Sequence, residues 1–226
     1  MNLNCKKILC TGLMLGVAPA SHAGLAAVGS NLVNDNVLNV TWTADANLLG
    51  TLEAGDAGLT AAIISDVGSI TDSLGIHTLS SADFGSNGQT DWWGSLAFIS
   101  YLNDTSYLGY HTWQLSDGNS LSYQFNTNLG ETPGTSLSNT SSNYPLFSNL
   151  QANAFWWTPA EALGTPANAV DFNTFYGYTG GADKTSQFYA WPVLPGNVTL
   201  PVPEPGSLWL FVSGVLGLCG FKRRQA

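Results

Sequence analysis

Three carboxylates in the second half of the chain, Glu161, Asp171 and Asp183, are the residues best suited to acid–base chemistry. Two carboxyl groups that flank a glycosidic bond can cleave it, provided that the fold holds them at the required separation. The sequence does not show whether two of these residues converge, and carboxylates in loops are commonly just solvated. Glycan hydrolysis by loop carboxylates is therefore an alternative function, and the sequence assigns no catalytic residue.

Other catalytic arrangements are missing from the sequence. It contains no GxSxG nucleophile elbow, no GxGxxG turn and no P-loop. His77 and His111 do not stand at a metal-ligand spacing such as HExxH, and His111 fits a structural, hydrogen-bonded position. The many carboxylates and amides are suitable calcium ligands, but no DxDxDG loop gathers them. We therefore expect no enzyme activity and no cofactor, and we assign no metal site.

Aromatic side chains give the best indication of a ligand. Tyr176 and Tyr178 fall on one side of the segment NTFYGY, and Trp157 can point away from its neighbour Trp156 in an expected strand. Aromatic rings stack on the apolar faces of sugars, while neighbouring amides bind hydroxyls. We predict glycan contact through Trp157, Tyr176 and Tyr178, against the alternative that these rings fill the core.

The charge of the chain limits the classes of ligand. Between residues 24 and 201 a single cation, Lys184, stands among fourteen carboxylates. Such a segment repels phosphate backbones and acidic polysaccharides, so we expect no nucleic-acid partner and a neutral glycan. The same segment has no cysteine, which excludes a disulfide framework and a catalytic thiol within it.

Several segments predict the elements that must position these residues. Helical spacing favours helices at 59–67 and 90–104, and a second short helix at 120–130 with Ser120 as its N-cap and Gly130 as its end. Strand patterns occupy 33–49 together with a turn, and then 110–115, 153–158, 168–178 and 187–194. The last two strands are expected to form a hairpin with Gly180 and Gly181 near its turn.

The first 23 residues are typical of a signal peptide. Lys6 and Lys7 supply the charged part, residues 8–18 the apolar part, and Ser21-His22-Ala23 a small-x-small cleavage site. Cleavage between Ala23 and Gly24 would release a mature chain that begins at Gly24.

The other end resembles a membrane anchor. Residues 207–221 carry no charge, and fifteen helical residues rise roughly 22 Å, which is short for a bilayer but sufficient if the flanking cations reach the headgroups. Lys222, Arg223 and Arg224 would keep the C-terminus in the cytoplasm and the acidic domain outside.

Pro203-Glu204-Pro205, followed by this apolar run and the basic cluster, resembles the PEP-CTERM sorting signal of Gram-negative bacteria. The resemblance implies processing by exosortase near the triplet, and transient anchoring in the inner membrane with the domain in the periplasm. The protein would then pass to the cell surface or the extracellular space, in association with exopolysaccharide.

A second resemblance covers roughly residues 32–198. The segments SYLGYHTWQLS, NAFWWT, NAVDFN and FYAWPVLPG, in this order, are similar to an extracellular family related to the C-terminal domain of bacterial collagen-like adhesins. The resemblance implies an α+β, C-type-lectin-like domain with two short helices on a twisted antiparallel sheet. Gln114, Ser116 and Leu194 stand where the family has arginine, proline and arginine, so binding of acidic sugars should not be carried over.

We therefore expect a signal peptide at 1–23, an extracellular lectin-like domain at 24–200 and a sorting signal at 201–226. The predicted role is structural or adhesive, in a matrix of neutral exopolysaccharide. The alternatives are a glycan-processing hydrolase and a protein-binding module without sugar specificity.

Overall fold

The computed structural model describes residues 21–22 and 24–199. The expected sorting motif and membrane helix lie outside the described residues, as does most of the expected signal peptide. Among the helices that the structure does describe, none combines the length and the apolar character needed to cross a bilayer.

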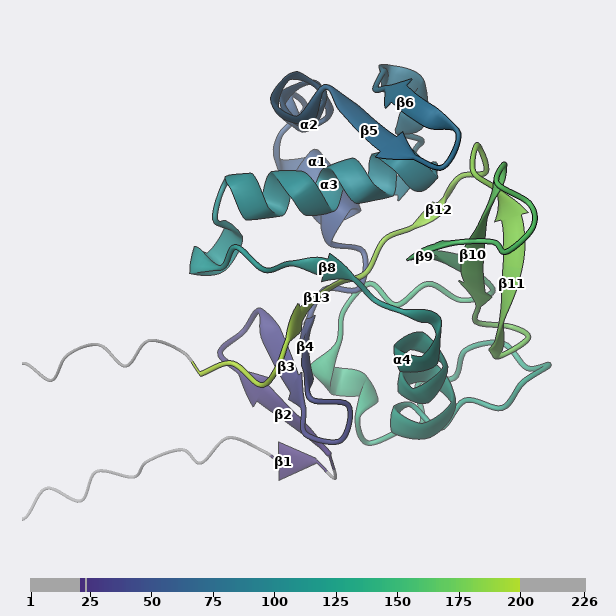
Figure 1. The fold of residues 1–226 in the computed structure, drawn as a ribbon. Helices are drawn as coiled ribbons and strands as arrows, with labels where there is room; N and C mark the ends of the chain where they lie inside the picture. The colour runs from purple at the N-terminus through teal and green to yellow at the C-terminus, as the bar shows by residue number, and fades with distance from the viewer. Residues whose placement is uncertain (1–20, 23, 200–226) are drawn as a thin grey trace, which may run out of the picture.

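Two larger sheets and a hairpin form the frame of the domain (Figure 1). The first sheet has the order β1-β2-β3-β4-β13-β8, and all its neighbours pair antiparallel. Its strands are β1 (Ser21–His22), β2 (Leu25–Val28), β3 (Leu32–Asp35), β4 (Val40–Thr43), β8 (Gln114–Leu115) and β13 (Pro192–Pro195). Since β13 pairs with β4, the beginning and the end of the described chain lie in one sheet.

The second sheet has the order β11-β10-β9-β12-β7, and β12 pairs with β9 in parallel through Tyr189 and Trp156. Its strands are β7 (Gln89–Thr90), β9 (Phe155–Glu161), β10 (Asn168–Asn173), β11 (Tyr178–Asp183) and β12 (Phe188–Tyr189). A separate hairpin consists of β5 (Ser69–Asp72) and β6 (Gly75–Thr78).

Four α-helices complete the described fold, so the mixed α+β class predicted from the sequence is confirmed, with more helices and sheets than expected. They are α1 (Leu48–Gly55), α2 (Leu59–Val67), α3 (Trp92–Asp104) and α4 (Gly118–Tyr123), and a π-helical segment, Gln124–Asn128, continues α4. Short 3-10 turns lie at Ser81–Asp83, Tyr107–Gly109 and Tyr144–Leu146. Figure 1 shows α1, α2, α3 and the β5–β6 hairpin together at one side, with α4 beside β10 and β11.

Local chemistry explains where two of the expected helices begin. The carboxylate of Asp91 accepts a hydrogen bond from the Gly94 N–H at 2.7 Å and caps α3. Asp117 does the same for α4 and accepts from the amides of Asn119 and Ser120. The prediction of Ser120 as the N-cap is therefore wrong by three residues, because the carboxylate that precedes it takes that position.

The predicted final hairpin is also wrong. Strand β10 pairs with β11 through a turn at 174–177, and Gly180 and Gly181 lie within β11 rather than at a turn. A Cβ at Gly180 would stand 3.3 Å from a carboxylate oxygen of Asp171, so the glycine makes room for that buried side chain. His111 lies outside any strand, and only Gln114–Leu115 of the predicted strand 110–115 pairs in a sheet.

Aromatic side chains dominate the core. Trp42, Trp156 and Trp191 are completely buried together with Phe125, and the ring centroids of Trp42 and Trp191 are 4.8 Å apart. A second buried cluster packs α2 and α3 against the sheets through Ile63, Phe98 and other apolar side chains. Burial of this much apolar surface stabilises a domain whose described residues contain no disulfide.

Candidate functional site

The structure places the predicted sites in very different positions. Pro203, Glu204 and Pro205 of the sorting triplet lie outside the described residues, as do Lys222, Arg223, Arg224 and Ala23. Gly24 is described, and its carbonyl accepts a hydrogen bond from the Asn36 N–H at 2.7 Å. Ser21 and His22 pair with Ala26 and Leu25, so cleavage after residue 23 would remove the edge strand β1.

Trp157 cannot contact a glycan in this structure. Its side chain is completely buried, and its indole N–H donates to the carbonyl of Thr90 at 2.9 Å. Phe188 packs against its ring, with centroids 4.6 Å apart. The alternative that Trp157 belongs to the core therefore holds for this residue.

Tyr176 and Tyr178 form the exposed aromatic pair of the domain. Their exposed fractions are 51% and 59%, and their ring centroids lie 5.6 Å apart with an interplanar angle of 31°. The pair stands at the connection between β10 and β11, where two neighbouring rings can present their faces to a ligand. The geometry thus leaves both tyrosines available for the predicted glycan contact.

The turn that carries this pair is held by several contacts. Asn173 accepts hydrogen bonds from the amides of Phe175 and Tyr176, at 2.8 and 2.9 Å. Gly177 has a φ of +72°, and a Cβ there would approach Pro133 to 2.8 Å. The Gly134 N–H also donates to the Phe175 carbonyl at 2.7 Å. The tyrosines therefore project from a turn of defined geometry.

Of the three carboxylates considered for catalysis, two accept hydrogen bonds from neighbouring residues and the third is buried. Glu161 accepts hydrogen bonds from Ser73 and lies 3.5 Å from the Lys184 Nζ. Asp183 accepts from the amide and hydroxyl of Thr185, and these bonds lower its pKa. Asp171 is buried in β10, and burial raises its pKa to about 6.

Two surface pockets have the size of a small ligand but lack the paired carboxylates of a hydrolase. One, of about 220 Å³, is lined by Asp45, Thr51 and Tyr107 among others. The other, of about 420 Å³, contains Asp56 beside Leu108, whose φ of 53° is unusual for a branched side chain. Each of these two pockets contains one carboxylate, whereas glycoside cleavage uses a pair.

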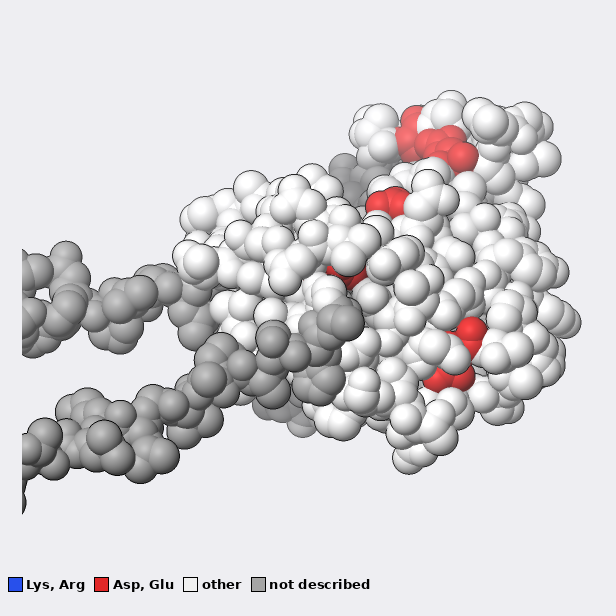
Figure 2. Space-filling model, turned by 90° about the horizontal axis from the view of Figure 1, so that it is seen from below, with Lys and Arg blue, Asp and Glu red and all other residues white. Residues whose placement is uncertain are grey.

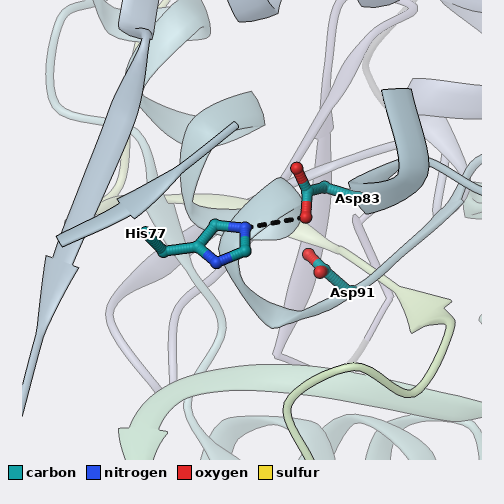
Figure 3. A group of neighbouring side chains, drawn as sticks. All are labelled: His77, Asp83 and Asp91. Carbon is teal, nitrogen blue, oxygen red and sulfur yellow. Dashed lines mark hydrogen bonds and ion pairs between the residues drawn. The ribbon is translucent and has the colours of Figure 1, made fainter. Parts of the chain in front are cut away.

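A cluster that the sequence analysis did not identify brings together His77, Asp83 and Asp91 (Figure 3). The His77 Nε2 lies 2.8 Å from the Asp83 Oδ1, and the Asp91 carboxyl group faces both residues. Asp83 is 4% exposed and Asp91 is 4% exposed, while part of the His77 side chain reaches solvent. The three residues come from β6, a 3-10 turn and the start of α3. Because three different elements bring them together, no single sequence motif predicts the cluster.

The pKa values of the two carboxyl groups of this cluster are shifted in opposite directions. Burial, together with the neighbouring Asp83 carboxylate, raises the pKa of Asp91 to about 8, against the effect of the Gly94 amide. Burial also acts on Asp83, but hydrogen bonds from the Ser80 amide, Asp91 and His77 outweigh it and lower the pKa of Asp83. These opposite shifts favour a protonated Asp91 beside an ionised Asp83.

The same donor atoms have the composition of a metal site. One nitrogen and two carboxylate oxygens lie within 4.8 Å of one another, and such a set suits zinc better than calcium. With a proton on Asp91, one of the two buried carboxyl groups is neutral, and a cation would have to displace that proton. We retain the prediction that no metal is bound.

The surface charge is more one-sided than the composition indicates. Lys184 is the sole Lys or Arg among residues 21–22 and 24–199, and it is completely buried. The face in Figure 2 accordingly shows separate patches of carboxylate and no basic side chain on the described residues. The described surface offers no cation to phosphate, sulfate or an acidic sugar.

Comparison with known proteins identifies the C-terminal segment. No curated protein and no solved structure matches the chain. Residues 201–224 match the family model described as the PEP-CTERM protein-sorting motif, which includes the predicted triplet Pro203-Glu204-Pro205 and the three cations. The chain therefore carries a PEP-CTERM sorting motif, which implies an exported protein that exosortase processes.

Proposed function

We propose that this exported protein is a structural or adhesive component of an exopolysaccharide matrix at the cell surface. The apolar run at 207–221 would anchor it in the inner membrane with the domain in the periplasm, until exosortase processes it near Pro203-Glu204-Pro205. The domain would then act at the cell surface or in the extracellular space. The sorting motif supports the export and processing by exosortase, and the surface of the domain supports the structural or adhesive role.

The observation that carries the proposal is the exposed pair of Tyr176 and Tyr178 on a surface without described cations. Two rings 5.6 Å apart can stack on successive faces of a sugar chain. A carboxylate-rich surface favours a neutral polysaccharide over an acidic one. The resemblance in motif order to an extracellular family related to the C-terminal domain of collagen-like adhesins also favours a lectin-like role for this domain.

The proposed role is not catalytic. Asp183 and Glu161 are held by hydrogen bonds from Thr185 and Ser73, whereas Asp171, Asp83 and Asp91 are buried and so closed to a glycan. A glycan that stacks on tyrosines without being cleaved would be held weakly at each site. Many copies in a matrix would then give strong attachment.

Two measurements test the proposal. The first is mass spectrometry of the mature C-terminus in host cells with and without exosortase. Processing near residue 203 that depends on exosortase is expected, and an intact end at Ala226 in both cells would refute the sorting route. The second is co-sedimentation of the mature protein with exopolysaccharide from the same cells. Equal retention of the wild type and a Tyr176→Ala/Tyr178→Ala double variant would refute the tyrosine site.

A further inference from the structure

Lys184 is a completely buried cation in direct contact with a buried anion. Its Nζ lies 2.7 Å from the Asp72 Oδ2, and the side chains of the two residues are 0% and 2% exposed. The Nζ also lies 4.6 Å from the ring centroid of Trp92 and 5.7 Å from that of Trp93. The aromatic rings exclude water from the ion pair. The two residues of the pair are 112 positions apart in the chain.

A second carboxylate stands next to the amine. The Glu161 Oε2 is 3.5 Å from the Lys184 Nζ, and 27% of the Glu161 side chain is exposed. Ser73 holds this carboxylate with its backbone N–H, 3.0 Å from the Oε1, and with its hydroxyl. Glu161 can therefore accept a proton from the amine and pass it on, while its own position stays fixed.

The Asp72 carboxyl group is surrounded by donors on both oxygens. Its Oδ1 accepts from the backbone N–H groups of Leu74 and Gly75, at 2.8 and 3.1 Å. Its Oδ2 accepts from the Trp93 indole N–H at 2.9 Å, in addition to Lys184. Two backbone donors on one oxygen form the arrangement that stabilises the negative charge of a tetrahedral adduct at a carbonyl carbon.

We propose that Lys184 and Asp72 are joined by an intramolecular amide bond that forms after folding, with Glu161 as the proton relay. The Lys184 Nζ loses a proton to Glu161 and forms a bond to the Asp72 Cγ, and the Oδ1 carries the negative charge of the adduct. The bond from Cγ to Oδ2 then breaks. Two of the three ammonium protons leave with Oδ2 as water, the third stays on the amide nitrogen, and Glu161 ends as it began.

The reaction needs no oxidant and no added reagent. An ammonium and a carboxylate are consumed, one amide and one water are formed, and the net charge is unchanged. Hydrogen bonds from Lys184, Trp93 and Leu74 outweigh burial and lower the pKa of Asp72, so the starting state is the ion pair and the protons that move are those of the ammonium. Because the product removes two charges from a site without water, burial favours the amide.

The bond would do for this domain what a disulfide does in other exported proteins. It would connect the end of β5 to the residue that follows β11, across a loop of more than a hundred residues in a segment without cysteine. Closure of a long loop restricts the unfolded chain and so favours the folded state. The inference is independent of glycan binding by Tyr176 and Tyr178.

The intact mass of the mature protein provides the first test. The wild type is expected to be lighter than its sequence by one water molecule. Trypsin gives a second readout, because Lys184 is the sole trypsin site between residues 24 and 201. An amide-bonded lysine is not cleaved, so the denatured wild type should remain whole across position 184, and digestion at aromatic residues should yield a branched peptide that contains Asp72 and Lys184. A succinimide at Asp117-Gly118 would also remove a water, but it would leave Lys184 cleavable.

Glu161→Gln tests the relay and retains the Lys184–Asp72 contact. This variant is expected to show the full sequence mass and cleavage at Lys184. The matched control Glu53→Gln, in α1, where the carboxylate accepts a hydrogen bond from the Thr60 hydroxyl, should keep the bond. A wild type with the full sequence mass that trypsin cuts at Lys184 would overturn the proposal. A Glu161→Gln variant that still lacks one water and resists trypsin would overturn the role of Glu161.

Discussion

The imidazole of His77 stacks on the indole of Trp93, with ring centroids 4.0 Å apart and planes that differ by 7°. The same indole donates its N–H to Asp72 at 2.9 Å. Through Trp93, the buried ion pair of Asp72 and Lys184 is therefore in contact with the cluster of His77, Asp83 and Asp91. The ion pair and the cluster both connect the β5–β6 hairpin to the start of α3, and each can be tested separately.

Stability should fall as the pH rises, because of Asp91. The folded protein holds this proton to about pH 8, whereas an unfolded carboxyl group releases it near pH 4. Between these values the folded state binds the additional proton, so its contribution is complete below about pH 4 and is lost by about pH 8. Urea unfolding at pH 5 and pH 9 should show this loss in the wild type and a much smaller one in Asp91→Asn. An equal loss in both proteins would contradict a protonated Asp91.

Zinc and chelators should leave the domain unchanged at neutral pH. A proton on Asp91 already neutralises one of the two buried carboxyl groups that a cation would contact. Thermal unfolding with excess zinc and with EDTA is expected to give the same midpoint. If zinc instead raised the midpoint, and His77→Gln but not His111→Gln abolished the rise, the cluster would be a metal site.

Loss of either exposed tyrosine should weaken glycan binding without a change in stability. Tyr176→Ala and Tyr178→Ala each remove one ring from the surface, and a stacked ring contributes about 0.5–1.5 kcal/mol, or a factor of roughly 2 to 12 in affinity. Retention on immobilised exopolysaccharide measures the effect. The control Phe155→Ala removes another partly exposed ring, 38% exposed, and should leave binding intact.

Alanine substitutions at Gly177 and Gly134 should distinguish the cost of backbone strain from the cost of a steric clash. Both have positive φ, +72° and +86°, but a Cβ at Gly177 would meet Pro133 at 2.8 Å, whereas one at Gly134 would meet nothing within 4 Å. We expect Gly134→Ala to cost about 1–2 kcal/mol of unfolding free energy and Gly177→Ala at least about 1 kcal/mol more. Chemical denaturation measures the difference in unfolding free energy between the two variants. Equal losses would show that Pro133 moves aside without an energetic cost.

Phe125 should be among the most costly truncations in the core. Its side chain is completely buried, and its ring lies 5.5 Å from Phe172 and 5.9 Å from Trp191, centroid to centroid. Phe125→Ala is expected to lower the free energy of unfolding by about 3–5 kcal/mol. The exposed Phe155 provides the control, since its truncation should cost far less in the same assay.

Local signals in the sequence predict a large part of this fold. Residues 59–67 form the expected helix with the expected bounds, and α3 follows the spacing of Trp92, Leu96 and Ile99. The prediction of a hairpin turn at Gly180 was wrong because this glycine instead makes room for the Asp171 side chain on the neighbouring strand. Which strands pair is decided in the folded sheet, so the hydrophobic periodicity of one segment cannot predict it.

The candidate sites follow the same division. The sorting motif is a contiguous sequence and was found from its letters alone. The exposure of Tyr176 and the burial of Trp157 depend on the turn at 174–177 and on Phe188, which local patterns do not specify. Lys184 was visible as the sole cation of the segment, but its partners Asp72 and Glu161 come from distant elements.

The pairing of β4 with β13 sets the order of events during export. A chain that crosses the membrane from its N-terminus delivers Trp42 early, but its partner Val193 arrives about 150 residues later. The Asn34 side chain must also wait for the Val198 carbonyl, to which it donates at 2.9 Å. The first sheet therefore closes only when translocation has almost reached residue 201, so the sorting motif is exported directly behind a domain that has just become able to fold.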